Sequence, residues 1–131
     1  MPAAASLETL IVDDQRSTRE LVRTCLVQLG FSRNRIRECE DGEAARVLLQ
    51  SARMHLIFSD LNMPRLDGLG LLRAVRGSPA IAKTAFIMLT GRADTALVQE
   101  AVKLGVNNYI VKPFTLETLK KKIEAVIGPL T

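Results

Sequence analysis

The stretch that decides the fold is His55-Leu56-Ile57-Phe58-Ser59-Asp60, followed by Leu61-Asn62-Met63-Pro64-Arg65-Leu66-Asp67-Gly68. Its run of apolar and small residues predicts a buried strand, and an aspartate stands at the carboxyl end of that strand. The proline and the glycine that follow break the chain before the next helix. Ligands of open α/β sheets bind outside the carboxyl ends of the strands, so Asp60 is the candidate centre of a functional site.

The composition describes one globular domain. The chain has 131 residues, of which 47% are hydrophobic and 24% charged, and this is enough to bury a core. No apolar run is long enough to span a bilayer, and the first residues lack the features of a signal peptide. We expect a loose tail over residues 1–6, a folded domain over residues 7–128 and no output domain. Cys25 and Cys39 are interpreted as buried thiols in a reducing cytoplasm, not as a disulfide framework.

The net charge of +4 raises the question of nucleic-acid binding. The sequence has no aromatic-rich basic stripe, no zinc-ligand spacing and no unassigned helix-turn-helix, so direct binding to nucleic acid is disfavoured. We prefer a basic surface that attracts an acidic protein partner. Arg16, Arg19 and Arg23 are three and four residues apart, on one face of a predicted helix, and fit this hypothesis. A solvated arginine face explains them equally well.

Five strands alternate with five helices along the chain. The first apolar run, over residues 7–12, ends on Asp13-Asp14, and Ser17-Thr18-Arg19-Glu20 is typical of a capping box with Ser17 as N-cap. The charged segment at residues 35–39 predicts an edge strand. The remaining expected strands cover residues 55–60, 85–90 and 108–111, and the expected helices cover about 18–29, 40–49, 68–76, 94–104 and 116–127. The short connections force an α/β fold, a doubly wound parallel sheet with helices on both faces.

Polar side chains stand just past four of these strands: Asp13 and Asp14, Asp60, Thr90 and Lys112. They share one edge of the sheet, because parallel strands all point the same way. Three crowded carboxylates repel one another unless a cation joins them, and an all-oxygen site with open positions suits Mg²⁺. The chemistry that fits is phosphoryl transfer onto an aspartate, with the metal, a lysine and a hydroxyl binding the phosphoryl oxygens.

The chain resembles the receiver domain of response regulators, especially the single-domain chemotaxis regulators, over essentially its whole length. The motifs that carry the resemblance are Val12-Asp13-Asp14, Ser59-Asp60-Leu61-Asn62-Met63-Pro64, Asp67-Gly68, Leu89-Thr90 and Tyr109-Ile110-Val111-Lys112-Pro113-Phe114. The resemblance implies a flavodoxin-like sheet with the strand order 2-1-3-4-5, which is the family's order and is carried over as such. It also implies a two-component signalling protein that accepts a phosphoryl group, not an enzyme.

By the same resemblance, Asp60 forms an aspartyl phosphate with a phosphoryl group from a phosphohistidine of a sensor histidine kinase or a phosphotransfer protein. Mg²⁺ would be held by Asp14 directly, by Asp13 mainly through water, and by Asp60 and the backbone carbonyl of Asn62. Asn62 and Arg92 occupy positions that tune dephosphorylation in the family. The long cation of Arg92 could either hold the phosphoryl group or hinder the attacking water, and the sequence does not decide between these effects.

The resemblance also implies a switch. Lys112 would pair with the phosphoryl group, positioned by a Lys112-Pro113 bond that is usually cis in the family. Thr90 would swing toward the phosphoryl oxygens and Tyr109 would turn inward behind it, so that the face of the fourth helix, fifth strand and fifth helix changes shape and binds a downstream protein. For Tyr109, a half-buried aromatic at the rim of the last helix is the simpler alternative. His55, the only histidine, is expected at the opposite edge, so the donor phosphohistidine belongs to a partner.

Other functions remain open. A receiver fold can act as a protein-binding module without being phosphorylated, or as a phosphate sink in a phosphorelay. Aspartyl-phosphate hydrolases of other doubly wound families place their nucleophile in an Asp-x-Asp arrangement on the first strand, and Asp13-Asp14-Gln15 lacks that spacing. A nucleotide- or flavin-binding protein is disfavoured, because aspartates follow the first strand where such proteins have glycines.

Overall fold

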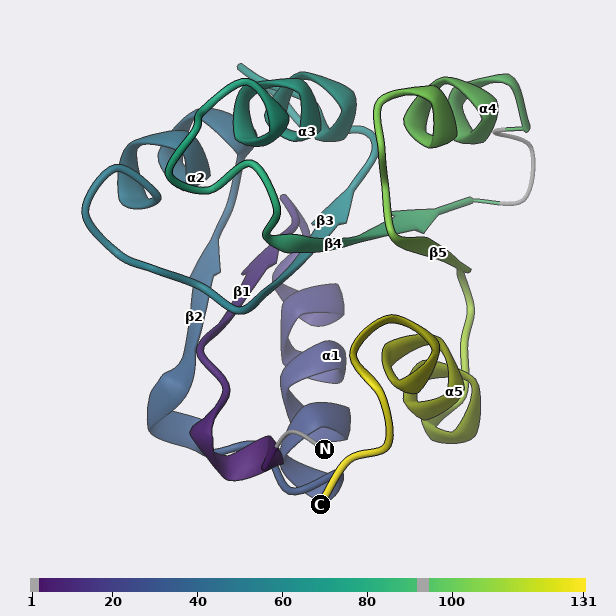
Figure 1. Cartoon of the computed structure of the whole chain (residues 1–131). Helices are drawn as coiled ribbons and strands as arrows, with labels where there is room; N and C mark the ends of the chain where they lie inside the picture. Colours follow the sequence, from purple (N-terminus) through teal and green to yellow (C-terminus); the bar gives the residue numbers. More distant parts are fainter. Residues whose placement is uncertain (1–2, 92–94) are drawn as a thin grey trace.

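The computed structural model describes residues 3–91 and 95–131 as one sheet with helices on both sides (Figure 1). The strands are β1 (Thr9–Val12), β2 (Ile36–Cys39), β3 (Leu56–Asp60), β4 (Ala85–Thr90) and β5 (Asn108–Val111). The α-helices are α1 (Arg16–Gln28), α2 (Gly42–Leu48), α3 (Gly68–Arg76), α4 (Thr95–Lys103) and α5 (Leu116–Ile127). These elements match the predicted ones to within a few residues at each end.

The strands lie in the order β2-β1-β3-β4-β5, and every neighbouring pair is parallel. The doubly wound fold and its expected order are therefore confirmed. The charged strand β2 is at an edge of the sheet, as its composition predicted. With all strands parallel, the carboxyl ends of β1, β3, β4 and β5 meet at one edge, which is where the candidate site residues were expected.

Two apolar cores flank the sheet, because successive side chains of a strand point to opposite faces. Ile11, Phe58 and Ile87 face α1 and α5, where they pack with Leu26 and Leu119. The neighbouring strand positions face α2, α3 and α4 on the other side; the fully buried members of this second core include Leu10, Ile57, Phe86, Leu71 and Leu72. Figure 1 shows the same division, with α2, α3 and α4 above the sheet and α1 and α5 below it.

The predicted capping box at the start of the first helix is wrong. Helix α1 begins at Arg16, its N-cap is Gln15, and no side chain caps it; Ser17 lies exposed within the first turn. The turn before the helix is held instead by Asp13, whose Oδ1 accepts the N–H of Gln15 at 2.8 Å. Asp13 thus fixes the turn before the helix, but it does not cap the helix itself. The last helix, by contrast, does have a capping side chain, since Oγ1 of Thr115 accepts the N–H of Thr118 at 3.1 Å.

The segment before β1 departs from the loose tail that we expected. Ala4–Ser6 forms a short 3-10 helix, and Ala4 is fully buried against the first core. The Ala4 N–H also donates to the carbonyl of Thr131 at 3.1 Å, so the two ends of the described chain lie together. Both cysteines are free thiols, Cys25 buried and Cys39 partly buried. Within the described residues, no helix has the length and apolarity to cross a membrane.

Candidate functional site

The sheet register brings the acidic residues together. Val12 pairs with Ser59 between β1 and β3, so the residues that follow them, Asp13 and Asp60, come at the same level of the sheet. Asp14 is next to Asp13 in the turn that leads to α1. One carboxylate oxygen from each aspartate lies within 4.8 Å of the other two. The three carboxylates therefore lie close together, as predicted.

Lys112 is the cation of this acidic pocket. It follows β5, and its Nζ lies 3.1 Å from Asp60 Oδ1 and 3.4 Å from Asp13 Oδ2. Burial alone would lower the pKa of Lys112, but the carboxylates of Asp60 and Asp13 outweigh burial and raise it, so the ammonium keeps its charge. The peptide bond between Lys112 and Pro113 is cis, as the family resemblance implied.

The charges of the pocket fit a divalent cation. Asp13 is fully buried, and burial, reinforced by the nearby Asp60, raises its pKa above the usual range. Among the described residues, the only basic group with an ion pair to these carboxylates is Lys112, so three acidic groups face one basic group. Oxygen donors this close, with an excess of negative charge and an exposed member in Asp14, are the ligand set that Mg²⁺ takes.

Asp60 is held at the mouth of the pocket by the loop that follows it. Its Oδ1 accepts the N–H of Leu61 at 2.9 Å, and Gly68 at the start of α3 donates its N–H to the Leu61 carbonyl at 2.9 Å. A Cβ at Gly68 would lie 2.2 Å from the Asp60 carbonyl oxygen, so only glycine allows this approach. Asn62 lies exposed in the same loop.

Two residues that support this loop were missed in the sequence. Arg65 has a positive φ of 68° and forms an ion pair of 2.9 Å with Asp41, which is 4% exposed. Asp41 also caps α2, since its Oδ1 accepts the N–H of Ala44 at 2.8 Å. The adjacent Gly42 donates its N–H to the Leu66 carbonyl at 3.0 Å. An Asp-Gly pair before a helix signals such a cap, but nothing in the sequence signals its pairing with Arg65.

The remaining predicted site residues lie around Lys112. Thr90 is 1% exposed at the end of β4; its Oγ1 donates to the Gly91 carbonyl at 3.1 Å, and its own carbonyl accepts the Lys112 N–H at 2.8 Å. Tyr109 is half-buried, with Lys122 Nζ of α5 4.9 Å from the centre of its ring. This is the half-buried rim arrangement that we had considered for Tyr109. Arg92 lies outside the described residues.

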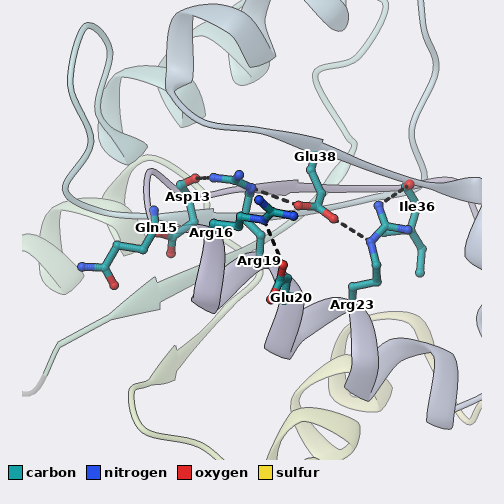
Figure 2. Close-up of polar contacts among 8 residues, drawn as sticks. All are labelled: Asp13, Gln15, Arg16, Arg19, Glu20, Arg23, Ile36 and Glu38. Atoms are coloured by element: carbon teal, nitrogen blue, oxygen red, sulfur yellow. Dashed lines mark hydrogen bonds and ion pairs between the residues drawn. The ribbon is translucent and has the colours of Figure 1, made fainter.

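The proposed basic face of α1 is largely absent (Figure 2). Arg19 and Arg23 both bind Glu38 of β2, at 2.9 and 2.6 Å, and their side chains are only 15% and 22% exposed. Arg16 alone of the three is well exposed, and it pairs with Glu20 on its own helix. The hypothesis of three arginines displayed to an acidic partner is therefore wrong, because an acid on the neighbouring strand neutralises two of them.

Residues 9–124 match the family model of the response regulator receiver domain, and the chain belongs to this family. It is 48% identical over 130 residues to the probable chemotaxis protein CheY of Rhizobium etli, an alignment that covers 99% of both chains. Chemotaxis response regulator CheY4 of Vibrio cholerae has a similar structure, with a TM-score of 0.81, 35% identity and coverage of 90% of this chain and 96% of that one.

A further similar structure is the receiver domain of a sensor histidine kinase from Pseudomonas aeruginosa, which has a magnesium ion coordinated in its active site cleft. Its TM-score is 0.83 at 27% identity, with coverage of 95% of this chain and 99% of that one. The chain is thus a CheY-like response regulator with an acidic pocket of Asp13, Asp14 and Asp60 for Mg-dependent phosphoryl acceptance. It is a two-component signalling protein that accepts a phosphoryl group, not an enzyme.

Proposed function

We propose that Asp60 is the residue that is phosphorylated, and that the donor is a phosphohistidine of a sensor histidine kinase or of a histidine phosphotransfer protein. One observation supports this choice above all. Asp60 Oδ1 is engaged by Leu61 and Lys112, whereas Oδ2 has no hydrogen bond within the described residues. Of the two buried carboxylates in the pocket, Asp60 therefore has an oxygen available for attack, while both oxygens of Asp13 are engaged.

The reaction is a displacement at phosphorus. Asp60 Oδ2 would form the new bond, and the bond from phosphorus to the donor imidazole would break. When bound at Asp13, Asp14, Asp60 and the Asn62 carbonyl, Mg²⁺ supplies charge neutralisation for the phosphoryl oxygens. Lys112 already lies beside Asp60 and would pair with the same oxygens. Asn62 and Arg92, two residues past Asp60 and Thr90, would set the lifetime of the phosphoryl group.

The output is a change of the face built from α4, β5 and α5. Thr90 would exchange its hydrogen bond to the Gly91 carbonyl for one to a phosphoryl oxygen, and Tyr109 would follow inward. This face carries exposed apolar side chains suited to a protein partner, namely Leu97, Val102, Val111 and Leu116. The similarity to chemotaxis proteins makes chemotaxis the proposed pathway, in the cytoplasm, with a downstream protein as partner.

The test is intact-mass spectrometry after incubation with a small-molecule phosphodonor, with Mg²⁺ or with EDTA. Wild type should gain one labile phosphoryl group only with Mg²⁺, and Asp60→Asn should gain none. Asp67→Asn is the matched control, because Asp67 lies in the same loop. Asp67 caps α3 by accepting the Gly70 N–H at 2.8 Å, and asparagine can accept the same hydrogen bond. A folded wild type that binds Mg²⁺ but takes up no phosphate would instead make the chain an unphosphorylated binding module.

A further inference from the structure

The main-chain N–H and the main-chain carbonyl of Asp13 are both held by hydrogen bonds. The N–H of Asp13 donates to the Cys39 carbonyl at 3.1 Å, which extends the pairing of β1 with β2 by one residue. The carbonyl of Asp13 accepts a hydrogen bond of 2.8 Å from Nη1 of Arg19, one turn into α1. Asp13 is fully buried, and a buried carbonyl requires a donor; in the described part of the chain only Arg19 supplies one.

Arg19 is itself fixed by an acid from another strand. Its Nε lies 2.9 Å from Glu38 Oε1, and the other oxygen of Glu38 lies 2.6 Å from Nε of Arg23 (Figure 2). Arg23 also donates a hydrogen bond of 2.9 Å to the Ile36 carbonyl. Glu38 is thus clamped between the guanidinium groups of Arg19 and Arg23. The planar guanidinium of Arg19 binds Glu38 with one nitrogen and Asp13 with another, which sets its orientation.

The turn that carries the two acids has little other support. Helix α1 begins without a capping side chain, and the carboxylate of Asp14 has no hydrogen bond or ion pair within the described residues. The direction of the Asp14 carboxylate therefore depends on the plane of the peptide between Asp13 and Asp14. Arg19 binds the carbonyl oxygen of this peptide and so fixes its plane.

We propose that Arg19 is a positioning residue for the Mg²⁺ pocket. It touches neither the metal nor the phosphoryl group; it orients the peptide that aims the carboxylates of Asp13 and Asp14, and Glu38 holds it in place. The proposal rests on the proposed function, because it assigns a role toward the same metal site. Removing an outer partner of a metal ligand typically weakens metal binding by about 10–100-fold, and we expect an effect near the lower end, since Arg19 acts through the backbone.

The test compares Arg19→Met with Arg23→Met. Both variants keep an apolar stem and break one arm of the Glu38 clamp, but only the first loses the contact to Asp13. Arg19→Met should raise the Kd for Mg²⁺, measured by calorimetry, by roughly 10-fold, and Arg23→Met should leave it within about 2-fold of wild type. In the metal-free protein, Arg19→Met should also speed hydrogen exchange of the Gln15 N–H, which donates to Asp13, and Arg23→Met should not.

Arg19→Lys covers the case in which Arg19→Met does not fold. The single ammonium of lysine cannot bind Glu38 and the Asp13 carbonyl with two separate nitrogens as the guanidinium does. This variant should therefore bind Mg²⁺ several-fold more weakly than wild type. Equal Mg²⁺ affinity in wild type and Arg19→Lys, or equal losses in Arg19→Met and Arg23→Met, would overturn the proposal while the phosphorylation of Asp60 still stands. A wild type that binds no Mg²⁺ at all would refute the metal site of the proposed function, and the role of Arg19 with it.

Discussion

Nζ of Lys112 lies 3.1 Å from Oδ1 of Asp60, although strand β4 separates the strands that precede these two residues. The long lysine side chain spans that strand and places its charge at the centre of the acidic pocket. Among the described residues, Lys112 is the only cation that forms an ion pair in this pocket, which holds three carboxylates. The metal-free pocket therefore keeps an excess of negative charge. The repulsion between these charges should lower the free energy of unfolding.

The first prediction concerns that repulsion. Asp13→Asn should make the metal-free protein more stable at neutral pH, because Asp13 is buried and its pKa is raised, by burial first and then by Asp60. The gain should be on the order of 1 kcal/mol, since charges a few ångströms apart interact by about 1–4 kcal/mol near a protein surface and Lys112 offsets a part. Urea unfolding in EDTA measures it. Adding Mg²⁺ should stabilise wild type more than the variant, and a variant less stable than wild type in EDTA would contradict the prediction.

The second prediction concerns acid sensitivity at Glu38. Burial would raise the pKa of Glu38, but the hydrogen bonds and charges of Arg23 and Arg19 outweigh burial and lower it. A lowered pKa means that the folded state favours the carboxylate, so this stabilisation is present at neutral pH and is lost as the pH falls through the folded-state pKa. Glu38→Gln should cost roughly 1–3 kcal/mol at pH 7 and should flatten the decline in stability below about pH 5.

Urea midpoints for wild type and Glu38→Gln, taken at intervals between about pH 7 and pH 3, measure this difference. Glu20→Gln is a suitable control, because Glu20 pairs with Arg16 on an exposed face and should contribute little. Parallel pH profiles for wild type and Glu38→Gln would show that the arginine clamp does not act through the charge of Glu38.

The third prediction concerns the close approach of α3 to Asp60. Gly68→Ala would place a methyl group 2.2 Å from the Asp60 carbonyl oxygen and 2.9 Å from the sulfur of Met88, so the backbone of Asp60 must move. We expect a loss of about 1–3 kcal/mol in stability and slower phosphorylation per folded molecule. Gly70→Ala is the control, because its nearest contact, at 2.5 Å, is the flexible end of Leu66. Phosphorylation of Gly68→Ala at the wild-type rate would contradict the prediction.

The fourth prediction separates stability from function. Arg76 donates hydrogen bonds to the carbonyls of Ala82, Thr84 and Gly105 and to Oδ1 of Asn107, at 2.7–3.1 Å. These acceptors lie just before β4 and β5, at the edge of the sheet opposite the pocket. Arg76→Met should therefore cost about 2–4 kcal/mol of stability, through carbonyls left without donors, and should leave phosphorylation per folded molecule unchanged.

Urea unfolding measures the stability of the variant. The intact-mass assay, applied to the same preparation, measures its phosphorylation per folded molecule. Arg73→Met, an exposed arginine on the same helix, should change neither of them. A phosphorylation defect in folded Arg76→Met would show that the two edges of the sheet are coupled.

Most of the fold could be predicted because its information is local. Apolar runs bounded by Gly, Pro and acids marked β3, β4 and β5, and the helical spacing after Gly68 marked α3 with its observed ends. The pocket could be predicted for a related reason. Once the strands are parallel, residues that follow them must share one edge, and no knowledge of side-chain packing is needed to bring Asp13, Asp60 and Lys112 together.

What could not be predicted depends on partners distant in the sequence. Arg19 and Arg23 have helical spacing that indicates a solvent face, and only the placement of β2 beside β1 reveals Glu38 as their partner. The pair of Asp41 and Arg65 is likewise separated by 24 positions and relies on a positive φ. Ser17 is not the cap because helix α1 begins one residue before it, at Arg16, after a turn that is held by the side chain of Asp13.

The hydrogen bond from Ala4 to Thr131 makes the described chain almost a closed ring. A short linker from residue 131 to residue 4 would close it at small entropic cost, and the exposed turn at residues 77–80, far from the pocket, is a natural place to open new ends. In such a circular permutant Lys112 would precede Asp13, Asp14 and Asp60 in the chain. The pocket would nonetheless be the same, because the sheet, and not the order of residues along the chain, assembles it.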